Sequence, residues 1–332
     1  MKPSRIFSVL SIAVVALVVW GCEKPYHQPE EKYILVAANV NLPYWQDAQA
    51  GLTDIGKTTG VKVDLVGPTS FSPTEELAAF KDAVAKHPSG ILVSVSDPKL
   101  FKEPIDAAIL SGLPVVCIDA DAPDSHRVMF IGTDNFRAGV ESAKHMAALL
   151  GGQGRVLLIG LSGQLNTEER LRGVNDALKG NPGMKIIQTV DDKGDARNAY
   201  DAVSALLQKH ERIDGIIGLE ASGGEGAAEA LHRMDLTGKV KILAFDKDPQ
   251  TLEGIERGWI TATVAQKPYV MAFYGVRFLD DLHHNAVHEF KDWATAPAAP
   301  LPVFVDTGTA IIDQTNLATF RKALAEHPKP VI

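Results

Sequence analysis

Short apolar runs and helical segments alternate along almost the whole of this chain. The first run, Ile34–Ala38, has no polar face, which is typical of a strand buried on both sides of a parallel sheet. Because strand–helix–strand crossovers are right-handed, the alternation predicts an α/β fold with doubly wound parallel sheets. The later runs expected as strands are residues 61–66, 91–95, 115–118, 128–131, 156–159, 186–190, 215–219, 240–245, 261–265, 303–305 and 309–312.

The number of strands argues for two lobes. About ten main strands in one sheet would be unusually wide, so two similar lobes of five strands each are expected. The break falls near Thr133–Asn135, roughly a third of the way along the 332 residues, and Asn135 is expected to cap the next helix. If the two lobes are equal in size, the first lobe must also include residues from the C-terminal third of the chain. The chain should therefore cross between the lobes more than once.

Composition narrows the function classes. A hydrophobic content of 45% and a charged content of 22% are those of a soluble globular protein. The net charge of -8 argues against a nucleic-acid partner, which would favour a basic patch. Two cysteines are too few for a disulfide framework.

The N-terminus has the features of an export signal. Basic residues precede the apolar run 6–20, which is short for a transmembrane helix and fits the h-region of a signal peptide. Gly21-Cys22 resembles the end of a bacterial lipobox, in which the cysteine is lipidated, although Trp20 is bulkier than usual there. We expect export to the periplasm or cell surface with lipid on Cys22; an uncleaved membrane anchor is the alternative. The resulting segments are a signal peptide, 1–21, and a polar tether, 22–32.

Aromatic and charged residues follow several of the expected strands. Tyr44 and Trp45 come after the first strand, Asp119 after the fourth, and Asp246 after a strand of the second half. Ligands of open α/β sheets bind at this carboxyl edge. Sugar rings stack on aromatics, and acceptor-only carboxylates with a donor-only arginine orient hydroxyls. Each of these residues also has an alternative interpretation. The aromatics could pack in the core, the aspartates could cap helices, and Arg170, the candidate arginine, could lie on the surface.

Six stretches follow one another in a characteristic order and spacing. They are Asn41–Trp45, Val116–Asp119, Gly132–Asn135, Glu169–Gly173, Ala244–Asp246 and Ala262–Gln266. Together they resemble the periplasmic sugar-binding proteins of ABC transporters, of the ribose-binding type. This is the type I periplasmic binding protein fold, which the effector domains of lactose-repressor-like regulators share. The resemblance covers the chain from about Tyr33 to its end.

The resemblance implies two lobes joined by a hinge with three crossings, near Asp134, Gln266 and Asp306. In such proteins aromatics sandwich a sugar, carboxylates and an arginine bind its hydroxyls, and a glutamine lies at the hinge. The matching positions are Tyr44, Trp45, Asp119, Arg170, Asp246 and Gln266. The implied lobes are residues 33–134 with 267–305, and 135–266 with 306–332.

The resemblance also implies a monomer that binds a sugar or polyol and delivers it to a membrane permease, without catalysis or a cofactor. Three departures argue against ribose: Leu42, Ala120 and Glu220 stand where the family has asparagine, arginine and asparagine. Glu220 would be a third acidic group facing the cleft. In the first alternative, which we favour, Glu220 is protonated or paired with Lys193 or Lys247, and the ligand is a neutral sugar. In the second alternative, the ligand is cationic.

Other function classes remain as alternatives. Two carboxylates facing a sugar are also the catalytic residues of most glycosidases, but the sequence has no nucleophile elbow. A repressor would need a helix-turn-helix where this chain has a signal peptide. A ligand-sensing partner of a membrane receptor is a further alternative, because its sequence would have the same features as that of a transport protein. His284 and His288 have no third ligand nearby in sequence, so no metal site is expected.

Overall fold

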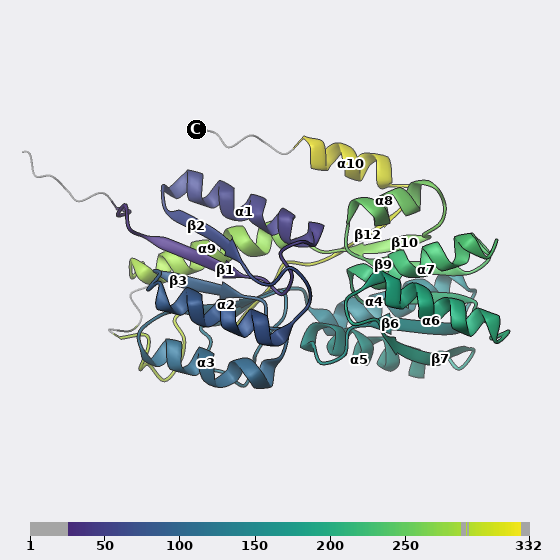
Figure 1. Ribbon diagram of the computed structural model, residues 1–332, viewed down its shortest axis with the longest axis horizontal. Coiled ribbons are helices and arrows are strands. Elements are labelled where there is room, and N and C mark those ends of the chain that lie inside the picture. Colours follow the sequence, from purple (N-terminus) through teal and green to yellow (C-terminus); the bar gives the residue numbers. More distant parts are fainter. Residues whose placement is uncertain (1–25, 287–289, 291, 327–332) are drawn as a thin grey trace, which may run out of the picture.

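The computed structural model describes residues 26–286, 290 and 292–326. The expected signal peptide, Cys22 and His288 lie outside these residues. The chain forms two α/β lobes side by side, and a six-stranded sheet is the centre of each (Figure 1). In the part of the chain that is described, no helix is long and apolar enough to cross a membrane.

The sheet of the N-terminal lobe has the strand order β11-β5-β4-β3-β1-β2, and every neighbouring pair is parallel. Helices α1 and α9 pack together on one face, and α2 and α3 lie on the other. The strands are β1 Lys32–Val36, β2 Lys62–Val66, β3 Gly90–Val93, β4 Val115–Ile118, β5 Met129–Gly132 and β11 Phe304–Asp306. The helices are α1 Pro43–Thr59, α2 Pro73–Ala85, α3 Pro98–Leu110 and α9 Pro268–His283.

The C-terminal lobe repeats this plan with the order β12-β10-β9-β8-β6-β7. Its helices pack as the pairs α4 with α5 and α6 with α7, while α10 contacts α8. The strands are β6 Gly154–Gly160, β7 Met184–Asp191, β8 Gly215–Gly218, β9 Lys241–Phe245, β10 Ala262–Ala265 and β12 Ala310–Asp313. The helices are α4 Asn135–Leu149, α5 Leu165–Lys179, α6 Ala196–Gln208, α7 Ala221–Arg233, α8 Pro249–Glu256 and α10 Leu317–Ala325.

The expectation of five strands in each lobe was wrong by one strand. The short strands β11 and β12 each extend one sheet at its edge, and β12 runs antiparallel to β10. Only a few residues join β11 and β12, yet the two strands belong to different lobes. The light-green α9 likewise lies within the purple and blue lobe, although β10, the strand just before it, belongs to the other lobe (Figure 1).

Local signals explain where most helices begin. Ser72 and Asp97 accept hydrogen bonds from backbone N–H groups in the first turns of α2 and α3, and proline follows each of them. The cap of α4 differs from expectation. Asp134, not Asn135, accepts the bond from Arg137 N, at 2.9 Å. The side chain of Asn135 instead accepts a hydrogen bond from Arg170 Nε.

Helices α4 and α5 approach each other backbone to backbone. A Cβ added at Gly139 would lie 2.0 Å from the carbonyl oxygen of Arg170, and one at Gly173 would lie 2.1 Å from that of Phe136. Only glycine fits such a contact. The contact holds the start of α5, and with it Arg170, at the edge of the sheet.

Candidate functional site

All seven residues expected to bind ligand line one cavity between the lobes. It lies at the carboxyl ends of β1 and β4 in one lobe and of β6, β8 and β9 in the other, as the rule for open sheets predicts. Its volume is about 70 Å³, against about 300–1,000 Å³ for sites of drug-sized ligands. The cavity therefore suits a compact ligand. The seven are Tyr44, Trp45, Asp119, Arg170, Glu220, Asp246 and Gln266.

The N-terminal lobe contributes an aromatic pair and a buried carboxylate. Tyr44 Oη donates to Asp119 Oδ1 at 2.7 Å, and Ser94 Oγ donates to Asp119 Oδ2 at 2.9 Å. Trp45 lies edge-to-face against Tyr44, with ring centroids 5.1 Å apart. Burial raises the pKa of Asp119, while Arg170 and the two hydroxyl donors act in the opposite direction. The carboxylate is thus held by neutral donors from its own lobe.

The two aspartates occupy equivalent positions in an unusual backbone conformation. Asp119 follows β4 with φ 62°, and Asp246 follows β9 with φ 69°. Left-handed conformations are uncommon for residues other than glycine, and strain of this kind concentrates at functional sites. Neither residue caps a helix, so the capping alternative does not hold.

Arg170 is the charged centre of the C-terminal half of the site. Its side chain is buried, and it donates from Nε to Asn135 Oδ1 at 2.9 Å and from Nη1 to the Leu219 carbonyl at 2.7 Å. Its Nη2 donates to Gln266 Oε1 at 2.8 Å, and the guanidinium lies 4.4 Å from the ring centre of Phe245. These bonds exclude the surface position considered for Arg170.

Gln266 connects the hinge to the site. Its Oε1 also accepts from Thr133 Oγ1 at 2.8 Å, and its Nε2 donates to Asp246 Oδ1 at 2.9 Å. Burial raises the pKa of Asp246 to about 7, although Arg170 opposes the effect. Thr133 and Gln266 come from two different crossings between the lobes, so this amide side chain bridges the hinge and the cavity.

Glu220 lines the cavity, but its carboxylate also caps α7. It accepts from Ser222 N at 2.9 Å and from Gly223 N at 2.6 Å. Burial, together with the neighbouring Asp192 carboxylate, raises the pKa of Glu220 well above its ordinary value. Lys247, one of the two lysines considered as its partner, instead pairs with Asp47 at 2.8 Å. Burial and Asp192 thus favour the protonated alternative for Glu220, and the two backbone hydrogen bonds oppose it.

Several lining residues escaped the sequence reasoning. Asn39 follows β1, and Gln164 and Asn166 follow β6, so the strand-end rule that selected the aspartates could have selected them too. These amides add neutral donors and acceptors to the charged groups. Phe71 lies in the loop before α2 and has no comparable signal in the sequence.

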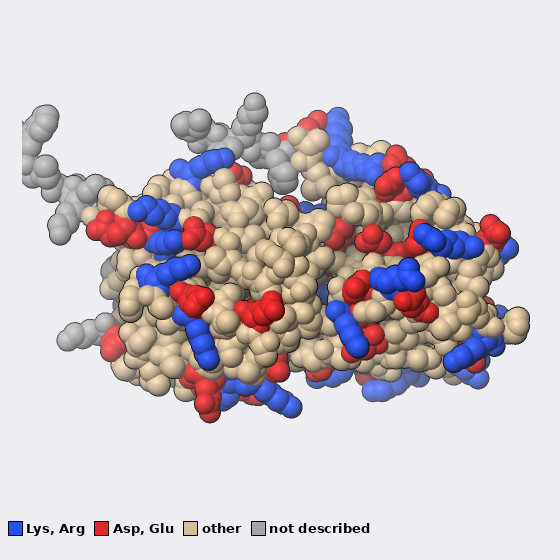
Figure 2. Space-filling view, in the orientation of Figure 1, with Lys and Arg blue, Asp and Glu red and all other residues tan. Residues whose placement is uncertain are grey.

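Features outside the cleft do not compete with it as a ligand site. A larger hollow, of about 1010 Å³, is lined only by residues of the N-terminal lobe, around α2, α3 and the end of α9. Among the described residues, it is not walled by both lobes as the cleft is. On the face in Figure 2, the lysine, arginine and acidic side chains of the described residues are interspersed over both lobes, which suits no polyanionic partner.

Comparison with known proteins agrees with this architecture. A family model described as a periplasmic binding protein domain matches residues 33–285. The chain belongs to this family. The solved structure of a sugar ABC transporter (sugar-binding protein) from Bacillus halodurans is 34% identical to this periplasmic binding protein, with a TM-score of 0.80. The match covers 87% of this chain and 100% of that one.

Two further relatives are similar over most of their length. AraP, an arabinose binding protein from Geobacillus stearothermophilus, is 33% identical with a TM-score of 0.75, over 88% of this chain and 99% of that one. The D-allose-binding periplasmic protein of Escherichia coli (strain K12) is 27% identical over 260 residues, which are 75% of this chain and 84% of the relative. The fold expected from the sequence, two lobes of the type I periplasmic binding protein class, is confirmed.

Proposed function

We propose that this periplasmic binding protein binds a neutral monosaccharide or sugar-like polyol between its lobes and delivers it to an ABC transporter permease. One observation carries the proposal. A small cavity walled by both lobes combines two aromatic rings with carboxyl groups, which only accept hydrogen bonds when ionised, and an arginine, which only donates them. The names of the relatives, which include arabinose- and allose-binding proteins, support the same class of ligand.

A thermal-shift screen of monosaccharides, polyols and amino sugars tests the proposal. A ligand at 100 times its Kd stabilises the folded state by about 2.7 kcal/mol, so the true ligand should raise the melting temperature clearly. Stabilisation by amino sugars alone would contradict a neutral ligand. If glycosides are cleaved during incubation, the protein is an enzyme, and the binding-only proposal is wrong.

Closure of the lobes should accompany binding. Trp45, Asp119, Arg170 and Asp246 are all buried between the lobes, so a ligand reaches them only when the lobes separate. The Lys247–Asp47 ion pair links the C-terminal lobe to α1 and stabilises the closed form. Ligand binding then shifts the population from open to closed molecules.

We expect the radius of gyration from small-angle X-ray scattering to fall when saturating ligand is added. The lobes are connected mainly by the three crossings, where Asp134 N donates to Asp306 Oδ1 at 3.1 Å and Thr307 N donates to the Gly132 carbonyl at 2.7 Å. A sugar that gives no thermal shift is the control. Superimposable profiles with and without the true ligand would count against a closing cleft.

Trp45 is proposed to stack on the ligand. Replacing it with alanine should weaken ligand binding by about 1–3 kcal/mol, the scale of a lost buried aromatic contact. Unfolding should stay cooperative. Titration calorimetry measures the effect, with Tyr274→Ala on the exposed side of α9 as the control. Unchanged affinity, or a lost melting transition, would instead assign Trp45 to core packing.

We also propose that lipid on Cys22 anchors the mature protein to a membrane as a monomer. Relatives named as periplasmic proteins support export, and the Gly21-Cys22 pattern supports the lipid. Cys22→Ser should move the protein from the membrane fraction to the soluble fraction. Wild-type protein that already fractionates as soluble would refute the anchor.

A further inference from the structure

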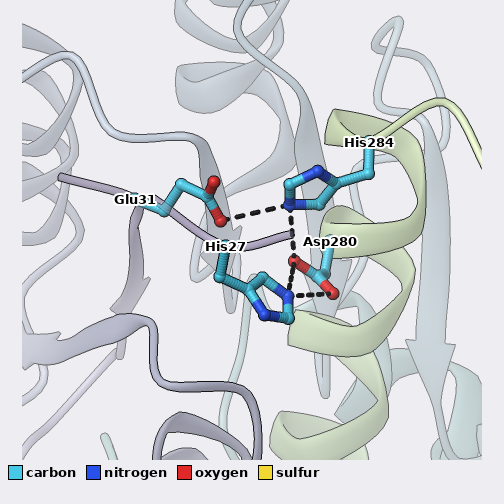
Figure 3. Close-up of side chains that lie close together, drawn as sticks. All are labelled: His27, Glu31, Asp280 and His284. Carbon is cyan, nitrogen blue, oxygen red and sulfur yellow. Dashed lines mark hydrogen bonds and ion pairs between the residues drawn. The ribbon is translucent and has the colours of Figure 1, made fainter. Parts of the chain in front are cut away.

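Four side chains with metal-binding atoms meet at the far end of the N-terminal lobe (Figure 3). They are His27 and Glu31, which precede β1, and Asp280 and His284, at the end of α9. One ligand atom from each lies within 4.8 Å of all the others. Helix α9 starts beside Gln266 in the cleft, and at 1.5 Å per residue its end is about 20 Å away. The cluster is therefore separate from the proposed sugar site.

The distances between these atoms suit a single small cation. Asp280 Oδ1 lies 3.1 Å from His27 Nε2 and 3.5 Å from His284 Nε2, and His284 Nε2 lies 3.1 Å from Glu31 Oε2. Ligands at about 2.0–2.2 Å from a tetrahedral zinc ion are about 3.3 Å from one another. Both histidines present Nε2, and two imidazoles with two carboxylates are a donor set that zinc accepts.

The charges at the cluster also suit a divalent cation. Glu31 and Asp280 are both buried, and imidazoles that bind a metal are neutral, so the four groups would present two negative charges to the ion. Arg277 is the neighbouring cation, but its Nη1 is 4.0 Å from Asp280 Oδ2 and the side chain is half exposed. A divalent cation would neutralise both carboxylates at once.

Surrounding groups orient the proposed ligands. Tyr33 Oη donates to Asp280 Oδ1 at 3.1 Å, and Gln28 N donates to Glu31 Oε1 at 2.6 Å. The ring of Tyr26 stacks on that of His284, with centroids 4.2 Å apart. Hydrogen bonds of this kind hold ligands in place around protein-bound metals.

We propose that His27, Glu31, Asp280 and His284 bind one zinc-type divalent ion, which fastens the segment before β1 to α9. Residues 26–31 were expected to be part of a tether, but the structure places them against the lobe. The sequence reasoning missed the site because it paired His284 with His288. The partners of His284 actually come from its own helix and from a segment about 250 residues away. A metal there would shorten the free tether and fix how the lobe is held relative to its anchor.

The test is a zinc titration of the full chain in detergent, produced without a histidine tag and stripped with EDTA. One equivalent of zinc should bind and raise the melting temperature. In His27→Gln, which changes only the segment before β1, zinc affinity should fall at least tenfold, and in the double variant with His284→Gln the thermal shift should disappear. His126→Gln, at an exposed histidine beside one carboxylate, is the matched control and should bind zinc like the wild type.

Two results would overturn the proposal. One is equal zinc affinity in the wild type and in His27→Gln. The other is wild-type protein that neither binds zinc nor gains stability from it, which would make the cluster a set of hydrogen bonds only. Affinity for the cleft ligand should be the same in all these variants, so failure here is distinguishable from failure of the proposed sugar-binding function.

Discussion

Replacing Arg170 with alanine is expected to abolish measurable ligand binding and to destabilise the fold by about 3–5 kcal/mol, the usual cost of removing one partner from a buried charged network. The guanidinium satisfies Asn135, Gln266 and the Leu219 carbonyl. It is also the positive charge that lowers the pKa of Asp119 and Asp246 against burial. Without it, both carboxylates face the cleft uncompensated. Urea unfolding and titration calorimetry measure the two effects.

Arg172 provides a control two residues along the same helix. Its side chain is 65% exposed and pairs with Glu169 at 3.1 Å, so Arg172→Ala should cost at most about 1 kcal/mol and leave ligand affinity unchanged. Similar results for the two alanine variants would show that Arg170 has no special role. Loss of stability with full retention of binding would make Arg170 a structural residue only.

Asp246→Asn is expected to be increasingly stabilising as the pH rises. Burial raises the pKa of Asp246 from an ordinary 3.8 to about 7, so between these values the folded state holds a proton that the unfolded state has released. Its contribution to stability is complete below about pH 4 and is lost as the pH rises through about 7. At about 1.36 kcal/mol per pKa unit, the stability of Asp246→Asn relative to wild type should rise by up to about 4 kcal/mol from pH 4 to pH 8.

The comparison between variant and wild type cancels the contribution of Glu76, whose pKa burial raises to about 8. Asp248, whose pKa of about 7 is due to burial and to Asp246, contributes to the difference together with Asp246. Asp214→Asn is a control of opposite sign. Burial alone would raise the pKa of Asp214, but hydrogen bonds from the Arg155 backbone N–H and the Arg212 guanidinium outweigh it, so the pKa is lowered. Its difference from wild type should be constant between pH 5 and pH 8. A constant difference for Asp246→Asn as well would contradict the raised pKa.

Much of the site could be predicted because position after a strand is a local property. Tyr44, Trp45, Asp119 and Asp246 each follow an apolar run, and parallel strands bring their carboxyl ends to one edge. The roles of polar side chains near the site were harder to predict from the sequence. Asn135 reads as a helix cap, yet it bonds to Arg170 while Asp134 caps the helix. Which of two adjacent polar side chains caps a helix depends on what the other can reach in three dimensions.

Alternating apolar runs, caps and strand-end residues determined the fold class, the two lobes and some of the residues that face the cleft, because burial and backbone propensity act along the chain itself. Tertiary structure alone decided how those residues are charged and paired. Glu220 lies half-buried beside Asp192, Lys247 pairs with Asp47, and His27 meets His284 across the lobe. These outcomes depend on burial and on distances of a few ångströms between segments far apart in sequence, and no local pattern encodes such distances.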